Sequence, residues 1–256
     1  MKYSLDLGLK NGELSEETTF SVPYSIGLFK ENLVINTFNH IQENNRDFIE
    51  KGIQYHLNGN ISEAIKYYQY CINEGFNDLR VFSNYSIILK DLGNFKEAER
   101  LIRKTIQINQ NHPEAYLNLG SILIDLSRFK EAETVTRKAI ELKPNFAKAY
   151  FNLANILRTL GKLDESESSF LKSIEFKSDY GDAYFNLANL FSYNNKLDDA
   201  IDYFRKAMIY NIDSNRCFVG IGKVLLKKGK HMEAIKMLKE GEGTIQFDLN
   251  HGILIC

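Results

Sequence analysis

The chain has 256 residues, of which 44% are hydrophobic and 25% charged, and its formal net charge is −1. These proportions are ordinary for a soluble folded protein, and the near-neutral balance argues against a nucleic-acid-binding protein, which normally carries a basic face. The sequence has no apolar run of about 18 residues, so no membrane span is expected. The N-terminal MKYSLDLGLKNGEL lacks the apolar stretch of a secretory signal. We therefore expect a cytoplasmic protein that binds neither nucleic acid nor membranes.

Residues 1–44 are polar and carry scattered glycines, and residues 15–19 are typical of a loop. Near the end of this region, Leu33, Ile35, Phe38 and Ile41 stand at spacings that suit a short helix over residues 29–41. A terminal repeat exposes an apolar face unless something covers it. Residues 1–44 are therefore predicted to form an N-terminal extension with a candidate capping helix for the repeats that follow.

From residue 45 the sequence repeats itself every 34 residues. The clearest copy, PEAYLNLGSILIDLSRFKEAETVTRKAIELKPNF, spans residues 113–146, and the next two copies follow without insertion. A constant period of this length is typical of stacked helical hairpins, and three or more copies suffice for stability. Six copies are predicted, at residues 45–78, 79–112, 113–146, 147–180, 181–214 and 215–243.

Three columns of residues keep their type in all six copies. In the clearest copy, Tyr116, Leu119, Gly120 and Leu123 stand at spacings of three and four that place them on one face of a helix, and Ala132, Val135 and Ala139 do the same for a second helix. In the clearest copy, the turn between the two helices is Ser127-Arg128, and the neighbouring copies have Gly93 and Gly161 at this place. Pro144 ends the second helix, because proline lacks an N–H and constrains the residue before it. The columns are Phe48, Phe82, Tyr116, Tyr150, Tyr184 and Phe218 (large, first helix); Gly52, Ser86, Gly120, Ala154, Ala188 and Gly222 (small, first helix); and Ala64, Ala98, Ala132, Ser166, Ala200 and Ala234 (small, second helix).

This pattern resembles the tetratricopeptide repeat. The resemblance covers residues 45–243 and implies an all-α fold, a right-handed superhelical solenoid of six helix-turn-helix repeats. The sequence departs from the family pattern in having no tryptophan, in keeping the terminal proline only as Pro144, and in placing Lys51 where the first copy needs an apolar residue. The first copy is therefore expected to be an irregular cap.

The period changes after Gly243. Ile245, Phe247 and Leu249 alternate with polar residues, which is a β-strand pattern, and residues 250–252 are suited to a turn. Residues 244–256 are therefore predicted to be a short β-like C-terminal tail, with a candidate hairpin. One interpretation is a plug over the exposed face of the last repeat, and the other is the remnant of a junction with a further domain.

No catalytic, metal-binding or nucleotide-binding motif is present, and the five histidines lie in different copies or tails. The cysteines Cys71, Cys217 and Cys256 are far apart and form no CxxC pair, so we interpret them as reduced thiols. The sequence therefore predicts no enzyme activity, no cofactor and no metal.

One column suggests a binding site. Asn84, Asn118, Asn152 and Asn186 recur at the 34-residue period in the first helices, which, by the family resemblance, line the concave face of the solenoid. Each amide both donates and accepts hydrogen bonds, so the row is suited to the backbone of an extended peptide. It is similar to the asparagine ladder of O-linked N-acetylglucosamine transferases. The neighbouring candidates are Asn155, Asn189, Phe151 and Phe185.

Each of these candidates has a structural alternative. The asparagines would serve hydrogen bonding between helices, and the phenylalanines would pack against the adjoining repeat. The leading hypothesis is a module that binds an extended peptide or partner protein in its concave groove. A second is the substrate-docking arm of an O-GlcNAc-transferase-like or other enzyme whose catalytic domain is absent here, since only about thirteen residues follow the array. A third is a scaffold that self-associates through the ends of the array.

Overall fold

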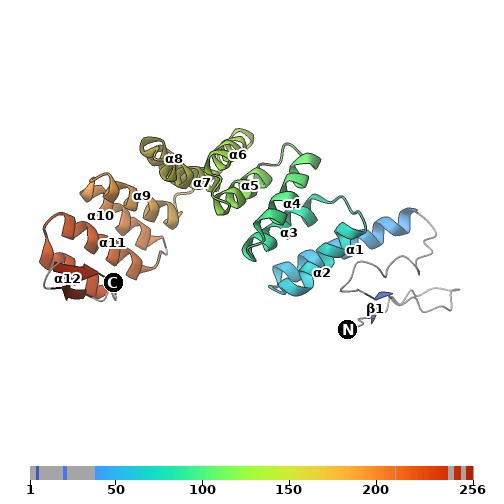
Figure 1. Ribbon diagram of the computed structural model, residues 1–256, viewed down its shortest axis with the longest axis horizontal. Coiled ribbons are helices and arrows are strands. Elements are labelled where there is room, and N and C mark those ends of the chain that lie inside the picture. The colour runs from blue at the N-terminus through green and yellow to red at the C-terminus, as the bar shows by residue number, and fades with distance from the viewer. Residues whose placement is uncertain are drawn as a thin grey trace. The chain divides into compact units, whose positions relative to one another are not determined.

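The computed structural model describes residues 4–5, 20–21, 38–210, 212–241, 245–248 and 252–255, with side chains over residues 45–210 and 212–241. Within these residues the chain forms twelve α-helices, which pair into six hairpins in chain order (Figure 1). The all-α array of helix-turn-helix repeats predicted from the sequence is therefore confirmed. The chain divides into two compact units, residues 1–110 and 111–256.

The helices of the first unit are α1 (Phe38–Leu57), α2 (Ile61–Asn73), α3 (Leu79–Asp91) and α4 (Phe95–Ile108). Those of the second are α5 (Pro113–Asp125), α6 (Phe129–Leu142), α7 (Ala147–Thr159), α8 (Leu163–Phe176), α9 (Gly181–Tyr193), α10 (Leu197–Ile209), α11 (Ser214–Lys227) and α12 (His231–Glu240). The predicted starts at 79, 113, 147 and 181 coincide with the starts of α3, α5, α7 and α9.

The first hairpin begins earlier than predicted. Helix α1 starts at Phe38 rather than at residue 45, so residues 38–41 of the candidate capping helix form its first turn. The remainder of that candidate helix, residues 29–37, lies outside the described residues. The helix therefore crosses the boundary predicted between the N-terminal extension and the repeat array.

The turn inside each hairpin has one recurrent geometry, in which a residue with positive φ follows the first helix. In the second repeat this residue is Gly93, whose N–H donates to the carbonyl of Lys90 while the N–H of Asn94 donates to the carbonyl of Leu89. These are the two bonds of a Schellman motif, in which glycine is favoured because a left-handed backbone crowds a Cβ atom. Ser127 takes the same position in the third repeat, with φ 58°.

The small columns let the two helices of a hairpin approach closely. Ala132 is fully buried, and a Cβ atom built on Gly120 would lie 2.5 Å from Thr136 Oγ1. The large column is less uniformly buried, since Phe82 is fully enclosed whereas Tyr116 and Tyr150 are partly exposed. In the second unit one apolar core runs continuously from α7 to α12.

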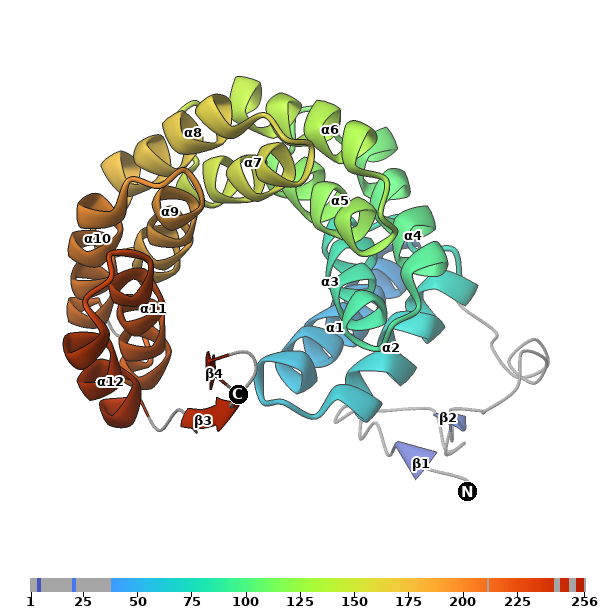
Figure 2. The same ribbon diagram turned by 60° about the vertical axis from the view of Figure 1, so that its left-hand side comes forward.

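The second unit has two layers of helices. The first helices of its hairpins, α5, α7, α9 and α11, lie on the inner side of the curve that this unit follows, and α6, α8, α10 and α12 lie on the outer side (Figure 2). Neighbouring first helices contact one another at α5–α7 and α9–α11. Side chains that recur at the repeat period on the first helices therefore form rows along the series of helices, and each row faces either the second helices or solvent.

Two short antiparallel strand pairs flank the helices. Strand β1 (Ser4–Leu5) pairs with β2 (Phe20–Ser21), and β3 (Ile245–Asp248) pairs with β4 (Gly252–Ile255) so that Ile245 lies opposite Ile255. Strand β3 contacts α12. The alternation of apolar residues after Gly243 therefore corresponds to a strand, as its pattern indicates, whereas β1 and β2 were not predicted.

Candidate interaction surfaces

The asparagine column of the first helices occupies equivalent positions in both units. Asn84 lies on α3 in the first unit, and Asn118, Asn152 and Asn186 lie on α5, α7 and α9 in the second. All four side chains are partly exposed. The three in the second unit form a row, one asparagine per repeat.

The hydrogen-bond partners of these amides differ from repeat to repeat. Asn84 Nδ2 donates to Tyr68 Oη on α2 at 3.4 Å, and Asn186 Nδ2 donates to the carbonyl of Asp182 one turn earlier at 2.8 Å. Neither Asn118 nor Asn152 forms a side-chain hydrogen bond with any described residue. The column therefore serves helix–helix bonding at Asn84, while two of its amides keep their bonding capacity for another molecule.

The change of partner follows from the residue that faces the asparagine. The repeat position of Tyr68 is held two copies later by Thr136, which is fully buried and whose hydroxyl oxygen has no partner within the described residues. A threonine side chain is too short to replace the phenol of tyrosine. This leaves Asn152 without the bond that Asn84 has.

The second asparagine column is bonded to its own helices. Asn155 Nδ2 donates to the carbonyl of Phe151 at 3.1 Å, and Asn189 Nδ2 donates to the carbonyl of Phe185 at 3.0 Å. Arg158 also donates to Asn155 Oδ1 at 3.3 Å. These two amides are therefore less available than those of Asn118 and Asn152.

The two phenylalanines pack against the second helices of their hairpins. The Phe151 ring lies 5.9 Å from Phe170 and 5.0 Å from Tyr180, measured between ring centroids. The Phe185 ring lies 5.4 Å from Phe204, and the guanidinium of Arg216 lies 4.5 Å from its centroid. Both rings are partly buried against the apolar core, which favours their packing role.

The cysteines that the structure describes have no features of a reactive site. Cys71 and Cys217 are free thiols and fully buried, and Cys256 lies outside the described residues. Burial raises the pKa of the Cys71 thiol to about 12 and that of Cys217 to about 11. Among the described residues, no group of three or more His, Cys, Asp or Glu side chains is arranged to hold a metal ion.

Ion pairs link successive repeats on the second helices. Lys162 donates to Glu133 at 2.9 Å, and the equivalent Lys196 donates to Glu167 at 2.8 Å one repeat later. Glu133 also accepts from Arg137, which reaches across to Glu165 at 2.7 Å. In the following repeat, Ile201 occupies the position of Glu133 and Glu167. Lys230, which is equivalent to Lys162 and Lys196, pairs instead with Glu233 of α12.

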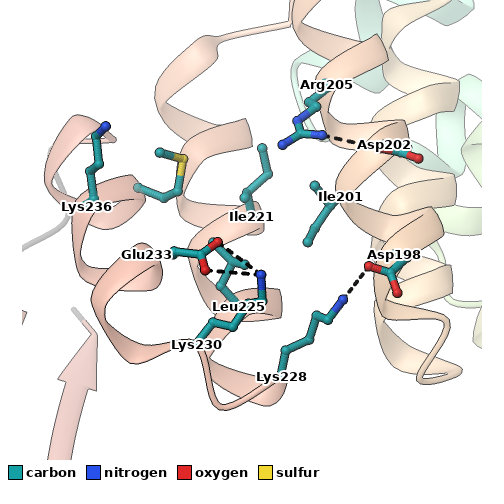
Figure 3. Close-up of a pocket in the computed structure, with 11 residues that line it drawn as sticks. Asp198, Ile201, Asp202, Arg205, Ile221, Leu225, Lys228, Lys230, Glu233 and Lys236 are labelled. Carbon is teal, nitrogen blue, oxygen red and sulfur yellow. Dashed lines mark hydrogen bonds and ion pairs between the residues drawn. The ribbon is translucent and has the colours of Figure 1, made fainter.

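A hollow lies on the second unit where this series of ion pairs is interrupted. It is formed by α10, α11 and α12 and has a volume of about 410 Å³ (Figure 3). Its apolar floor consists of Ile201, Ile221, Leu225 and Met237. This hollow was not predicted from the sequence, although the sequence shows Ile201 at the repeat position that Glu133 and Glu167 hold in the two preceding copies.

The fold and these surfaces define a class: an array of helical hairpins with a repeating face. Models of the tetratricopeptide repeat match residues 113–146 and 145–208. The matched part of the chain, residues 113–208, therefore consists of tetratricopeptide repeats. The family match and the fold support a protein-interaction repeat module. No curated protein matches the sequence at a significant level.

Several solved structures share this fold. PilW, a type IV pilus biogenesis factor, is 17% identical, with a TM-score of 0.70, over 77% of this chain and 91% of its own. PilF of Pseudomonas aeruginosa is 16% identical, with a TM-score of 0.67, over 77% of this chain and 89% of its own. YrrB, described as a repeat protein with an unusual peptide-binding site, is 18% identical, with a TM-score of 0.55, over 68% of this chain and 90% of its own. At these identities the likeness establishes the fold alone.

No helix within the described part of the chain is both long and apolar enough to cross a membrane.

Proposed function

We propose that the protein is an interaction module that binds an extended peptide, or an extended segment of a partner protein, on the inner side of its first helices. One observation carries the proposal: the amides of Asn118 and Asn152 are partly exposed in one row and have no partner among the described residues. A polar group left without a partner is best satisfied by water or by a ligand. YrrB, which shares the fold, has a peptide-binding site of its own.

The chemistry of the row suits a peptide backbone. Each primary amide has two N–H donors and an accepting oxygen, so it pairs with both the N–H and the C=O of a peptide unit. Asn186 contributes its oxygen and its second N–H, because only one bond to Asp182 is made. Recognition through the backbone gives affinity with little sequence preference, and the partly exposed edges of Phe151 and Phe185 supply the adjoining apolar contact.

The test uses peptides selected from a displayed random library on the immobilised full chain. The double substitution Asn118→Ala and Asn152→Ala should weaken their binding about tenfold or more, because each lost net hydrogen bond is worth about 0.5–1.5 kcal/mol. The matched control, Asn73→Ala with Asn145→Ala, removes two exposed amides away from this row and should leave affinity unchanged. Equal affinity of both double variants would refute the proposal.

The two other functions raised by the sequence, a docking arm of an O-GlcNAc-transferase-like enzyme and a self-associating scaffold, stay predictions. No described residue and no reported comparison bears on either of them.

A further inference from the structure

The hollow between α10, α11 and α12 arises from a single break in the repeat pattern. Glu133 and Glu167 each accept a hydrogen bond from the lysine that begins the next second helix, and these pairs bridge the outer surface between successive repeats. Ile201 cannot accept such a bond, so the surface between α10 and α12 has no bridging ion pair at this position. The depression at this place is lined by the partly exposed Met237 and by the outer edges of Ile201, Ile221 and Leu225, which are otherwise buried.

Charged side chains surround the apolar floor. Lys228 pairs with Asp198 and Lys230 with Glu233, while Arg205 lies 3.4 Å from Asp202 (Figure 3). The Arg205 and Asp202 side chains are 68% and 64% exposed, so their mutual attraction is weak. Lys236 forms no ion pair with any described residue. The rim therefore offers Lys236 and Arg205 as cations available to a partner.

The positive charge of the last hairpin also favours an acidic partner. Residues 214–241 contain seven Lys or Arg and two Asp or Glu, so this segment has a formal charge of +5, although the whole chain has −1. The positive charge is therefore concentrated on the hairpin that forms two of the three walls of the hollow. A basic surface of this kind attracts acidic partners and accelerates their association.

We infer that this outer hollow is a second docking site, which takes an acidic segment of a partner protein through one apolar side chain. The apolar side chain would contact Ile201 and Met237, and carboxylates on either side of it would meet Arg205 and Lys236. A protein segment fits better than a nucleic acid because the apolar floor takes an aliphatic side chain, which a nucleic acid does not have. The site lies on α10–α12, apart from the row of Asn118 and Asn152, so it extends the proposed function instead of depending on it.

Two fluorescein-labelled synthetic peptides serve as probes, an acidic peptide with one central leucine and the same peptide with serine at that place. Fluorescence anisotropy with the full chain measures their binding, and NMR of the labelled protein locates it. The leucine peptide should bind about tenfold more tightly than the serine peptide, because one buried apolar side chain contributes enough for such a ratio. Its largest amide shifts should fall on α10, α11 and α12.

Three single variants separate the site from general electrostatics. Lys236→Glu, at an exposed position, should weaken the leucine peptide about tenfold. Ile201→Glu should abolish the preference for leucine, because it replaces an apolar residue of the floor with a charged one. Glutamate is also the residue found at this repeat position in the two preceding copies, where Glu133 pairs with Lys162 and Glu167 with Lys196. Lys223→Glu makes the same change of charge at an exposed position of α11 outside the hollow and should have little effect.

The inference is overturned by any of three results: equal binding of the two peptides or none at all, equal loss in Lys236→Glu and Lys223→Glu, or tighter binding of a single-stranded thymidine oligonucleotide that displaces the peptide. Binding of the acidic leucine peptide should survive the Asn118→Ala and Asn152→Ala changes, so failure of one site is distinguishable from failure of the other.

Discussion

The side-chain amide of Asn84 donates to the phenol oxygen of Tyr68 at 3.4 Å and thereby ties α3 to the second helix of the preceding hairpin. The same repeat position two copies later, Asn152, has no such bond, because Thr136 replaces the tyrosine. One column of asparagines therefore holds both a structural amide and an available one. The two roles have different consequences for stability.

We expect Asn84→Ala to lower the free energy of unfolding by about 0.5–1.5 kcal/mol, the net value of one hydrogen bond. Asn152→Ala should change it by less than about 0.5 kcal/mol, as is usual for a substitution without a lost partner. Urea denaturation of the two variants measures the difference. Tyr68→Phe is the companion variant: it removes the hydroxyl that contacts both Asn84 and His56 Nδ1, so its loss should be at least as large as that of Asn84→Ala. Equal losses at Asn84 and Asn152 would contradict the assignment of the two roles.

The second prediction concerns Ser127, which takes the left-handed turn position with φ 58°. The equivalent residues Gly93 and Gly161 have φ 78° and 76°. A residue with a Cβ atom costs about 1–2 kcal/mol in this conformation, and glycine does not. Ser127→Gly should therefore raise the melting temperature, and Gly161→Ser should lower it. Both are exposed turn residues with no other role in the described structure, so opposite signs are expected from thermal denaturation.

The fold was predictable because it depends on local, periodic information. Every hairpin reuses the same small residues where helices approach, such as Ala132 and Gly120, and the same positive-φ turn position, so the columns locate five of the six first-helix starts to within about one residue. The start of α1 was missed because it lies before the first repeat, where no neighbouring copy supplies a column for comparison.

The functional surfaces were only partly predictable, because they depend on what faces each repeated residue. The sequence shows that Asn84 and Asn152 recur, yet whether an amide is available is decided by Tyr68 or Thr136 on another helix. Similarly, the sequence shows Ile201 at the repeat position of Glu133 and Glu167, yet the hollow that Ile201 lines also needs residues of α11 and α12. The availability of an amide and the presence of a hollow depend on residues that differ from one repeat to the next, whereas the fold depends on residues that stay the same in every repeat.

The third prediction tests the small column. Ala132 is fully buried at the contact between α5 and α6, so Ala132→Phe forces the two helices apart. Overpacking of this kind costs about 1–3 kcal/mol, and the melting temperature should fall accordingly. Thr134→Phe places the same ring at an exposed position of the same helix and should cost far less. An unchanged melting temperature for Ala132→Phe would show that the helices do not approach at this residue.

The fourth prediction concerns the ion pairs between repeats and their dependence on pH. Partial burial of Glu133 by itself raises the pKa of its carboxyl, but the hydrogen bonds from Lys162 and Arg137 outweigh this effect and hold the pKa below the usual 4.5. A carboxyl whose pKa is lower in the folded state stabilises the fold at pH values above its unfolded pKa, and this contribution is lost as the pH falls through the folded pKa. Glu133→Gln should therefore reduce the free energy of unfolding at about pH 7 by up to about 1 kcal/mol, as expected for exposed ion pairs.

At an acidic pH below the lowered pKa of Glu133, where the native carboxyl also becomes protonated, the difference between the variant and the original protein should shrink towards zero. Urea denaturation at the two pH values gives this comparison directly. Glu175→Gln is the matched control, because Glu175 is exposed and forms no ion pair with any described residue, so it should show no such pH-dependent difference. If Glu133→Gln were equally destabilising at both pH values, the loss would come from packing, and the ion pairs of Glu133 with Lys162 and Arg137 would contribute nothing to holding successive repeats together.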